Sequence, residues 1–275
     1  MNAALPHESA DSGGPNGRPK KRFGQHFLAD PNTARIVAAG VSGEDVVLEV
    51  GPGRGALTTV LAERARLVYA VEVDEAVIPA LRDATAGYDN VRIHTGDALS
   101  FDYASLAPAP SAMAANLPYN VASPLVLYLL EEVCSLRRLR FMVQLEVARR
   151  MAAAPRRKDY GAYAVLSQLL AEVSVEHRVS RHVFDPPPRV ESAVVQMSRR
   201  GDQSLEPGEY AGVKELVLAA FRSRRKRLAN NLSGEERGLA PAALRSLGFG
   251  PDARAEELSP EDFVALYRAL YGGGT

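Results

Sequence analysis

The chain has 275 residues, of which 46% are hydrophobic, so it can bury a substantial core, and this excludes a disordered or fibrous protein. Its single cysteine, Cys134, excludes a disulfide framework and a cysteine-rich zinc site, and its five histidines are not spaced as metal ligands, so we expect no metal. The formal net charge is zero, but the cations are clustered, and phosphate binding depends on local clusters more than on the sum.

Residues 1–17 are predicted to form a flexible extension, because they are rich in Gly, Pro, Ser and Asn and show no apolar periodicity. They also lack the apolar centre of a signal peptide, and no apolar run in the sequence approaches the roughly 20 residues that span a bilayer. Together with the single cysteine, these features predict a cytoplasmic protein with no membrane partner.

Strands and helices alternate in the next part of the chain. Asp30-Pro31 predicts the cap and first turn of a helix, and residues 51–55 are a glycine cluster between a strand and a helix. In chain order we expect a helix over 32–39, a strand over 46–50, a helix up to about Arg64, a strand over 68–73, a helix over 75–84, strands over 91–94 and 111–115, a helix over 122–133 and a strand over 139–145. The alternation predicts an α/β fold, in which a Rossmann-like parallel sheet is covered by helices on both faces.

The pattern changes in the last third of the sequence. Residues 172–179 and 192–198 alternate apolar and polar side chains, which predicts an antiparallel pair that closes the sheet. The polar stretch 199–208 indicates a linker. Helical periodicity over 210–221, 223–232, 241–246 and 261–270 then predicts a small all-helical domain. We therefore expect a catalytic domain over 18–200 and a helical C-terminal domain over 207–275.

A glycine-rich loop follows the first predicted strand. Gly51, Gly53 and Ala56 match the pattern G-x-G-x-x-G/A directly after Glu49-Val50, at the sheet edge where doubly wound folds bind ligands. Glycine lets the backbone turn sharply and approach a ligand closely. Alone, this loop fits a dinucleotide, another nucleoside cofactor or a turn without ligand. No Lys-Ser or Lys-Thr follows it, which disfavours a triphosphate.

Acids at the next two strand ends favour a nucleoside cofactor. Glu72 ends the second strand, where its carboxylate can accept both ribose hydroxyls of an adenosine. Asp97, followed by Ala98, comes after the third strand, where it can reach the adenine amine. Either acid alone is more often a solvated loop residue. Glycine, Glu and Asp at three consecutive strand ends are typical of an adenosine site.

The segment Asn116-Leu117-Pro118-Tyr119 follows the fourth strand and would face the same crevice. An aromatic amine such as adenine N6 is a poor nucleophile, because its lone pair is delocalised, so it must be held and rehybridised. The Asn116 oxygen and a backbone carbonyl can accept the two N6 hydrogens, and Pro118 fixes the backbone around them. Tyr119 offers a flat face to an extruded base. A lone match is more often a turn, but its place after the fourth strand favours a catalytic site.

These motifs resemble those of the bacterial ribosomal RNA small subunit adenine N6,N6-dimethyltransferases, the kasugamycin-sensitivity type. The resemblance runs from about residue 21 to residue 270. It is carried by Phe23-Gly24-Gln25-His26-Phe27-Leu28, residues 49–55, residues 116–120 with Ser123-Pro124-Leu125, Val183-Phe184-Asp185-Pro186-Pro187-Pro188-Arg189-Val190, and Arg224-Arg225-Lys226 with Asn230-Asn231-Leu232.

The resemblance implies S-adenosylmethionine as cofactor and dimethylation of two adjacent adenosines near the 3′ end of 16S rRNA, within an immature small ribosomal subunit. The sequence says nothing of oligomerisation, and a monomer is our default expectation. Asn116 would orient the target amine, and Tyr119 and Phe184 would sandwich the flipped base. From the residues alone, Phe184 is more often a core aromatic. The residues expected at the cofactor are Gln25, His26, Leu28, Glu49, Gly51, Gly53, Glu72, Asp97, Ala98 and Asn116. Many relatives carry Asn in place of His26, so a backbone and a side-chain contact are both open there.

Two basic clusters are predicted to contact RNA phosphates rather than to be solvated. The first precedes the cofactor motif, and the second places five cations within six residues of the helical domain, more than one solvated helix face needs. Their members are Lys20, Lys21, Arg22, Arg222, Arg224, Arg225, Lys226 and Arg227.

Other functions remain open at this point. A resistance methyltransferase that modifies one adenine of large-subunit RNA and blocks macrolide binding shares the catalytic loop, but Asn120, residues 123–125 and residues 224–226 are more similar to the small-subunit enzymes. A ribosome-assembly factor that checks the immature subunit, with incidental methylation, would carry the same motifs. An NAD dehydrogenase would explain the glycine loop and leave residues 116–119 unexplained.

Overall fold

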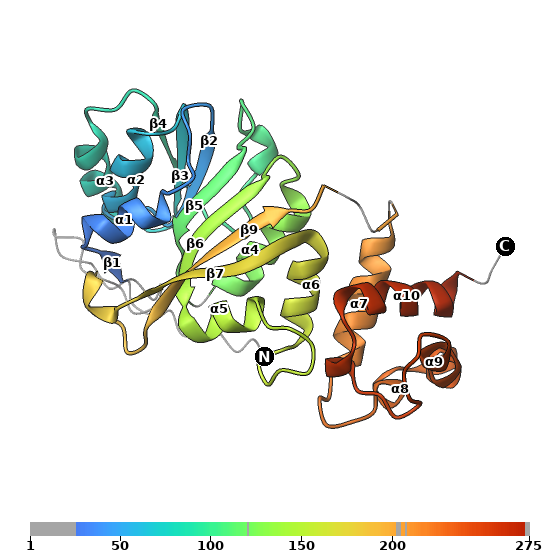
Figure 1. The fold of residues 1–275 in the computed structure, drawn as a ribbon. Helices are drawn as coiled ribbons and strands as arrows, with labels where there is room; N and C mark the ends of the chain where they lie inside the picture. The colour runs from blue at the N-terminus through green and yellow to red at the C-terminus, as the bar shows by residue number, and fades with distance from the viewer. Residues whose placement is uncertain (1–25, 120, 202–204, 207, 273–275) are drawn as a thin grey trace, which may run out of the picture.

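The computed structural model of the chain describes residues 26–119, 121–201, 205–206 and 208–272 (Figure 1). Several predictions concern residues outside these ranges: the extension over 1–17, the cations Lys20, Lys21 and Arg22, the cofactor contact of Gln25, and Asn120. Among the described residues, no helix is long and apolar enough to cross a membrane, and no group of three or more His, Cys, Asp or Glu side chains is arranged to hold a metal ion.

A seven-stranded sheet with the strand order β4-β3-β2-β5-β6-β9-β7 lies at the centre of the fold (Figure 1). Its strands are β2 (Val46–Val50), β3 (Leu67–Glu72), β4 (Val91–Thr95), β5 (Ala112–Asn116), β6 (Arg138–Gln144), β7 (Ala171–Val179) and β9 (Ser192–Arg199). The first five are parallel, and β9 is antiparallel to both β6 and β7. The predicted Rossmann-like sheet with an antiparallel end pair is therefore confirmed, with the later strand, β9, inserted between β6 and β7.

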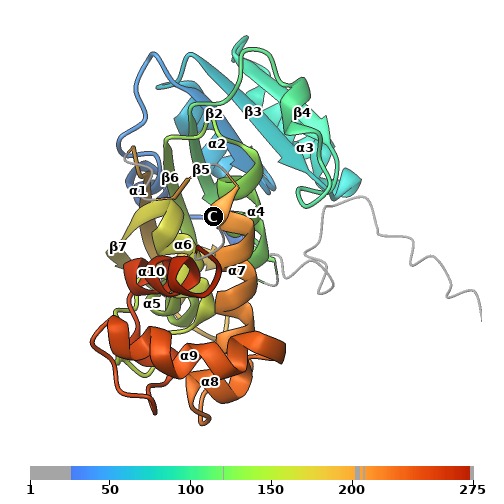
Figure 2. The ribbon, with the colours of Figure 1, turned by 90° about the vertical axis from the view of Figure 1, so that its right-hand side faces the viewer.

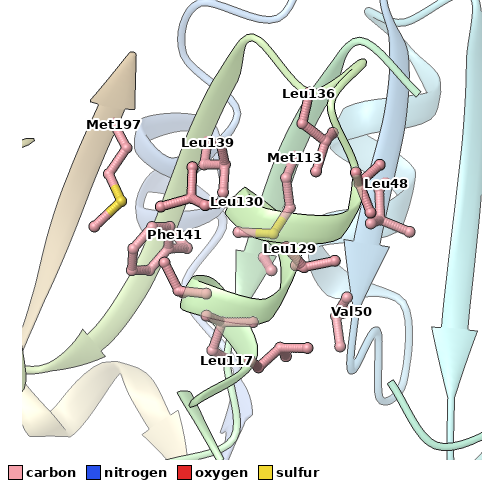
Figure 3. Packing of buried hydrophobic residues seen from close by; sticks show 14 of the residues in the cluster. Leu48, Val50, Met113, Leu117, Leu129, Leu130, Leu136, Leu139, Phe141 and Met197 are labelled. Atoms are coloured by element: carbon pink, nitrogen blue, oxygen red, sulfur yellow. The ribbon is translucent and has the colours of Figure 1, made fainter. Parts of the chain in front are cut away.

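Helices cover both faces of the sheet (Figure 1). They are α1 (Pro31–Val37), α2 (Ala56–Ala62), α3 (Ile78–Thr85), α4 (Ala122–Glu132), α5 (Leu145–Met151) and α6 (Ala162–Leu170), with 3-10 turns at Glu75–Val77, Tyr103–Ser105, Arg181–Val183 and Ala255–Glu257. Apolar side chains of α1 and α2 pack in one cluster with Val47 and Val68, whereas α4 and α5 pack in another. Leu129 and Leu130 of α4 lie against Met113 and Phe141 (Figure 3). The sequence analysis did not predict α5 and α6.

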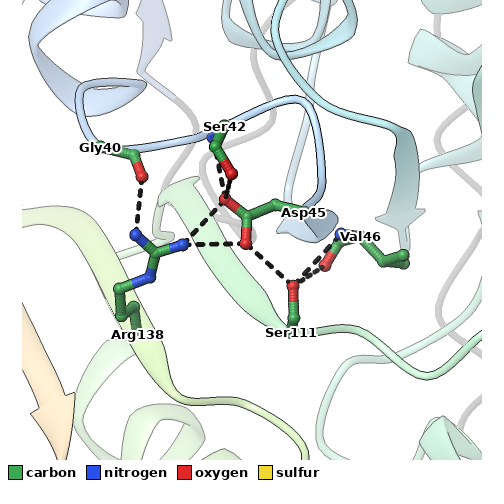
Figure 4. Close-up of polar contacts among 6 residues, drawn as sticks. All are labelled: Gly40, Ser42, Asp45, Val46, Ser111 and Arg138. Atoms are coloured by element: carbon green, nitrogen blue, oxygen red, sulfur yellow. Dashed lines mark hydrogen bonds and ion pairs between the residues drawn. The ribbon is translucent and has the colours of Figure 1, made fainter.

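The amino ends of three central strands are fixed by the buried carboxylate of Asp45 (Figure 4). It accepts hydrogen bonds from the Ser42 amide at 2.8 Å, the Ser111 hydroxyl at 3.0 Å and the Arg138 guanidinium at 2.8 Å. Burial acts to raise the pKa of Asp45, but these hydrogen bonds outweigh it and hold the pKa below its ordinary value. The polar anchor lies at the sheet edge opposite to the predicted site.

The C-terminal helices are α7 (Glu209–Ala220), α8 (Leu228–Asn231), α9 (Gly234–Ser246) and α10 (Pro260–Tyr271). Their core includes Leu127 of α4 and Leu166 of α6, and Figure 2 shows α8 and α9 farthest from the strands. The helices predicted over 210–221 and 261–270 are confirmed. The helix predicted over 241–246 begins seven residues earlier, at Gly234, and carries Pro241 in its interior.

The prediction of one helix over 223–232 is wrong. Residues 221–227 form turns, and only α8 is helical in this stretch. The Asn231 side-chain amide donates to the carbonyls of Ala220 at 2.6 Å and Ser223 at 2.9 Å, which folds the chain back on the end of α7. The basic cluster therefore lies on a turn, which we name the basic turn (residues 222–227).

Side chains of the sheet domain and the C-terminal helices are joined by specific polar contacts. Glu131 of α4 accepts hydrogen bonds from the Tyr210 hydroxyl at 2.7 Å and from Lys214 Nζ at 2.8 Å. Arg199, predicted as the first linker residue, is instead the last residue of β9, and its guanidinium donates to the carbonyls of Leu136 and Leu130, both at 2.8 Å. The Glu131 contacts fix α7 against α4, the helix that follows residues 116–119, whereas the Arg199 contacts join β9 to the end of α4 within the sheet domain.

Replacing Arg156 with asparagine is expected to stabilise the protein. Arg156 has a φ of +66°, a left-handed conformation that costs an ordinary residue about 1 kcal/mol and that asparagine tolerates. Its amide donates to the Glu256 carbonyl at 2.7 Å in either variant. We expect Tm to rise by about 2 °C in calorimetry. Arg157→Asn, an adjacent exposed change without positive φ, is the control, and an equal rise there would contradict the explanation.

Candidate active site

A cavity of about 570 Å³ opens at the carboxyl ends of β2, β3 and β5. Most of the predicted site residues that are described lie in its wall, namely His26, Leu28, Glu49, Gly51, Gly53, Glu72, Asp97, Ala98, Asn116, Pro118 and Tyr119. Phe184 and the basic turn are not part of this wall. The structure therefore brings together residues that are separated by up to 93 positions in the sequence, because parallel strands end at the same edge.

The glycine loop (residues 51–55) connects β2 to α2, and its residues 51–54 line the cavity. Gly53 has a φ of +56°, and a Cβ atom there would lie 2.9 Å from the ring of Phe27. Only glycine fits this position without a shift of Phe27 or of the backbone. The guanidinium of Arg54 lies 4.5 Å above the same ring. The segment before the sheet and the glycine loop are therefore packed as one wall.

Glu72, at the end of β3, holds the glycine loop as well as facing the cavity. Its Oε2 atom accepts the Gly53 amide at 3.0 Å, and Oε1 accepts the amides of Val73 at 3.0 Å and Asp74 at 2.9 Å. Burial raises the pKa of Glu72, although these three hydrogen bonds act in the opposite direction. A carboxylate has about four acceptor sites, so one site on Oε2 remains for a ribose hydroxyl beside these three bonds.

Glu49 provides a second buried acid in the same wall. The residue is 1% exposed, and its Oε2 atom has no hydrogen-bond partner among the described residues. Burial, with the charge of Glu72 adding to it, raises the pKa of Glu49 to about 8. An unpaired buried carboxyl oxygen is costly unless a ligand satisfies it. The site therefore fits a cationic cofactor such as S-adenosylmethionine, which carries a sulfonium and an ammonium group.

The loop after β4 brings Asp97 and Ala98 to the cavity. Asp97 Oδ1 accepts the Leu99 amide at 3.0 Å, which shapes the turn. From behind, the hydroxyl of Tyr103 donates to the Ala98 carbonyl at 2.8 Å, and the Tyr103 ring packs edge-on against Phe101 at 5.1 Å. Tyr103 is 6% exposed and does not line the cavity. It therefore supports the predicted adenine contact without touching the ligand space.

Replacing Tyr103 with phenylalanine is expected to weaken cofactor binding. The change removes only the hydroxyl that holds the Ala98 carbonyl, a hydrogen bond worth about 1 kcal/mol, so the Kd for S-adenosylmethionine should rise about fivefold. The value of kcat at saturating cofactor should stay within about twofold. Titration calorimetry measures the Kd. Tyr88→Phe, which removes the exposed Tyr88–Glu63 bond, is the control, and unchanged affinity in Tyr103→Phe would refute the supporting role.

Asn116, the last residue of β5, has a fixed orientation. Its Nδ2 atom donates to the backbone carbonyl of His26 at 3.1 Å, which leaves Oδ1 as an acceptor in the cavity wall. The carbonyl of Pro118 accepts the Val121 amide at 3.2 Å, and Pro118 packs against Gly51. The Pro118 carbonyl is thus already engaged, and the carbonyl of Leu117, a residue that also lines the cavity, is our candidate for a second acceptor in the catalytic loop (residues 116–119).

Tyr119 is held at two points. Its hydroxyl lies 2.6 Å from the Ser192 hydroxyl, and its ring centroid lies 5.5 Å from that of His26. His26 Nδ1 lies 2.8 Å from the Pro186 carbonyl oxygen and therefore acts as a donor. His26 thus makes a side-chain contact and a main-chain contact at once. Its imidazole binds the chain after β8 (Phe184–Asp185), while its carbonyl orients Asn116.

The structure does not place Phe184 opposite Tyr119. Phe184 is 3% exposed and pairs with Leu28 in a two-stranded sheet formed by β1 (Phe27–Leu28) and β8, which the sequence analysis missed. Its side chain belongs to the core cluster that contains Val37 and Met142. The short β pairing turns the Phe184 ring to the core in this structure, and its stacking on a flipped base stays a prediction. Its neighbour Asp185 lines the cavity instead.

The basic turn lies apart from the cavity wall. Its Arg224 and Arg227 form ion pairs with Glu256 at 3.2 Å and Asp252 at 2.8 Å. All five of its cations are exposed. Their contact with RNA stays a prediction.

A Rossmann-like sheet with a glycine loop, buried acids and an Asn-Leu-Pro-Tyr segment around one cavity defines an S-adenosylmethionine-dependent methyltransferase. The model of the ribosomal RNA adenine dimethylase family matches residues 16–271. The chain belongs to this family and is an enzyme of rRNA adenine methylation.

Relatives with high sequence identity cover nearly the whole chain. The chain is 69% identical over 253 residues to Ribosomal RNA small subunit methyltransferase A of Rubrobacter xylanophilus, with 92% of this chain and 95% of the relative covered. It is 41% identical over 259 residues to the protein of the same name from Chromobacterium violaceum, with 93% and 97% covered.

Solved structures share the fold. The 23S rRNA methyltransferase ErmE is 30% identical, with 89% of this chain and 99% of that chain covered and a TM-score of 0.69. A dimethyladenosine transferase from Plasmodium falciparum is 24% identical, with 88% and 96% covered and a TM-score of 0.76.

Proposed function

We propose that this chain dimethylates the N6 amines of two adjacent adenosines near the 3′ end of 16S rRNA. The observation that carries the proposal is the fixed amide of Asn116, which presents Oδ1 to a cavity that is also lined by Glu49, whose buried Oε2 atom has no partner among the described residues. The names of the relatives at 69% and 41% identity support the small subunit as the source of the RNA.

The residues of the catalytic loop would position the amine for transfer. Asn116 Oδ1 and the Leu117 carbonyl accept the two N6 hydrogens, which directs the lone pair away from the base plane. Tyr119 supports the base by stacking, a contact worth roughly 1–3 kcal/mol. S-adenosylmethionine, when bound, supplies an electrophilic methyl group. The proton leaves to water after the amine becomes cationic, so no residue has to act as a general base, and positioning provides most of the rate.

Glu49, Gly51, Glu72 and Asp97 are proposed to hold the cofactor, with Glu49 facing its cationic part. His26, Leu28, Gly53 and Ala98 share the wall and are proposed as further contacts. The proposal for Phe184 requires β8 to move when a base enters, since its ring is packed in the core.

The helical C-terminal domain and its basic turn are proposed to bind RNA phosphates on an immature small subunit. The enzyme is proposed to act as a monomer in the cytoplasm, where its rRNA substrate is assembled. When cations of the protein neutralise RNA phosphates, the binding affinity falls steeply as the salt concentration rises. A salt titration of RNA binding therefore measures this contact.

The experiment is incubation with labelled S-adenosylmethionine and unmodified small or large ribosomal subunits, followed by mapping of the methylated nucleotides. The proposal expects label on two adjacent adenines of the small subunit. Label on one large-subunit adenine would instead favour the macrolide-resistance function, for which the 30% identity to ErmE is the supporting observation. A catalytically inactive chain that still binds immature subunits and impairs growth more than deletion would favour an assembly checkpoint.

A further inference from the structure

The contact between Tyr119 and Ser192 joins the catalytic loop to a distant strand. The two hydroxyl oxygens lie 2.6 Å apart, although the residues are 73 positions apart in the sequence. Ser192 is fully buried and does not line the cavity, whereas Tyr119 does. Any effect of Ser192 on a bound base would therefore pass through Tyr119.

Ser192 is held in a rigid place. It is the first residue of β9, and its backbone pairs with Gln144 of β6 on one side and with Val179 of β7 on the other. The preceding residue, Glu191, accepts the Leu145 amide through its carbonyl at 2.9 Å. A side chain on an inner strand that is paired on both sides is a precise support for a functional group.

Ser192 contacts Tyr119, and the Tyr119 ring is the surface on which a flipped base would stack. The Ser192 contact fixes the hydroxyl end of Tyr119, and the His26 ring lies beside it at 5.5 Å with an interplanar angle of 34°. Since the hydroxyl is engaged in the protein, the face of the ring remains for the substrate. A ring that is tied at its tip cannot tilt freely about its own bonds.

We propose that Ser192 is a positioning residue for methyl transfer, which holds the Tyr119 ring at the angle at which the target adenine stacks on it. The inference rests on the proposed function of Tyr119 as the stacking surface. It assigns a catalytic consequence to a side chain that never touches base or cofactor. A misplaced base lowers the rate strongly, because transfer depends on alignment of the amine with the methyl group.

The test is a double-mutant cycle of S192A, Y119F and the double variant, with S167A as the matched control. Ser167 of α6 is likewise a serine that is almost completely buried, at 1% exposure, and it lies outside the cavity wall. Steady-state kcat and KM for RNA, the Kd for S-adenosylmethionine and Tm are measured for each protein.

The single variants S192A and Y119F are each expected to lower kcat about fivefold to tenfold, the loss that one hydrogen bond of ordinary strength implies. The double variant should lose no more than either single one, and cofactor affinity should stay within about twofold of the unchanged chain. S167A should keep the kcat of the unchanged chain. Three results would overturn the proposal. The losses of kcat in S192A and Y119F could multiply in the double variant, S192A could lose cofactor affinity in parallel with kcat, or S192A could keep the kcat of the unchanged chain.

Two measures keep the inference separate from the proposed function. If the unchanged chain methylates large-subunit RNA instead, the same cycle is run on that RNA. If it methylates neither, the NMR signal of the Tyr119 ring, assigned by its loss in Y119F, reports the contact directly and should shift in S192A and not in S167A. Should S192A fail to fold, Y119F removes the same hydrogen bond from the other side, and an unchanged kcat in Y119F would then overturn the proposal.

Discussion

Replacing Asn116 with alanine is expected to lower kcat for methyl transfer on the order of 10³-fold, the size of effect that follows loss of a preorganised polar group at the reacting atoms. The variant loses the Oδ1 acceptor for the target amine, whose lone pair then stays delocalised. The fold should survive, because the lost bond to the His26 carbonyl is one contact of 3.1 Å at the cavity wall. Labelled-methyl incorporation into small-subunit RNA measures the change.

The variant Asn116→Asp tests whether the orientation of the acceptor oxygen matters, or only its presence at position 116. The aspartate keeps an acceptor but loses the Nδ2 donor, so it places a carboxylate oxygen against the His26 carbonyl oxygen. We expect a loss of at least about 100-fold in kcat, with the Kd for S-adenosylmethionine within about fivefold in both variants. Asn32→Ala, at an exposed asparagine of α1, should be active. Substantial activity in Asn116→Ala would rule out the role assigned to this residue.

The cavity could be predicted from the sequence because it follows from parallel strand geometry. Once Glu49, Glu72 and Asn116 are placed at strand ends, a parallel sheet brings them to one edge whatever the details of the helices. The order of β9 and β7 was less accessible, since alternating residues identify two antiparallel strands without saying which one is paired on both sides.

The missed helices have a physical reason. The segment Ala162–Leu170 is a short, mostly apolar run that continues directly into β7, and such a run cannot be told from a buried strand by its pattern alone. At the basic turn the opposite holds. Residues 222–227 carry charges and no apolar stripe, and the hydrogen bonds of Asn231 to the carbonyls of Ala220 and Ser223 hold the backbone there.

Side-chain roles were the least predictable part. A large aromatic such as Phe184 fits a core and a stacking site equally well, and only its pairing with Leu28 places it in the core of this structure. The contacts of Ser192 and Tyr103 were invisible for a related reason, since each acts from outside the cavity on a residue that lines it.

Replacing Glu49 with glutamine is expected to change how stability depends on pH. Burial raises the pKa of this carboxyl from 4.5 to about 8, so the folded, cofactor-free chain keeps a proton that the unfolded chain releases. Below about pH 4.5 both states are protonated and the wild-type chain pays no penalty. As pH rises towards 8, the unfolded state gains by ionising and the wild-type free energy of unfolding falls, on the order of 5 kcal/mol in total.

Glutamine does not titrate, so the difference in unfolding free energy between Glu49→Gln and the wild-type chain should grow in favour of the variant from pH 5 to pH 9. Urea unfolding of the cofactor-free proteins at pH 5 and pH 9 measures this difference. Glu72, whose charge also raises the pKa of Glu49, is present in both proteins, so its own titration is common to the two curves. Calorimetry at pH 7 should show the opposite order for binding, with affinity for S-adenosylmethionine at least about tenfold weaker in Glu49→Gln. A bound cation favours release of the Glu49 proton to solvent, and the resulting carboxylate neutralises the cofactor, which an amide cannot do. If the free energy of unfolding of the two proteins changes with pH in the same way, Glu49 is already ionised in the empty cavity. If Glu49→Gln is stabilised but binds S-adenosylmethionine with unchanged affinity, Glu49 does not contact the cofactor. The same substitution thus strengthens the fold and weakens the function, which is expected of a buried acid kept for a ligand.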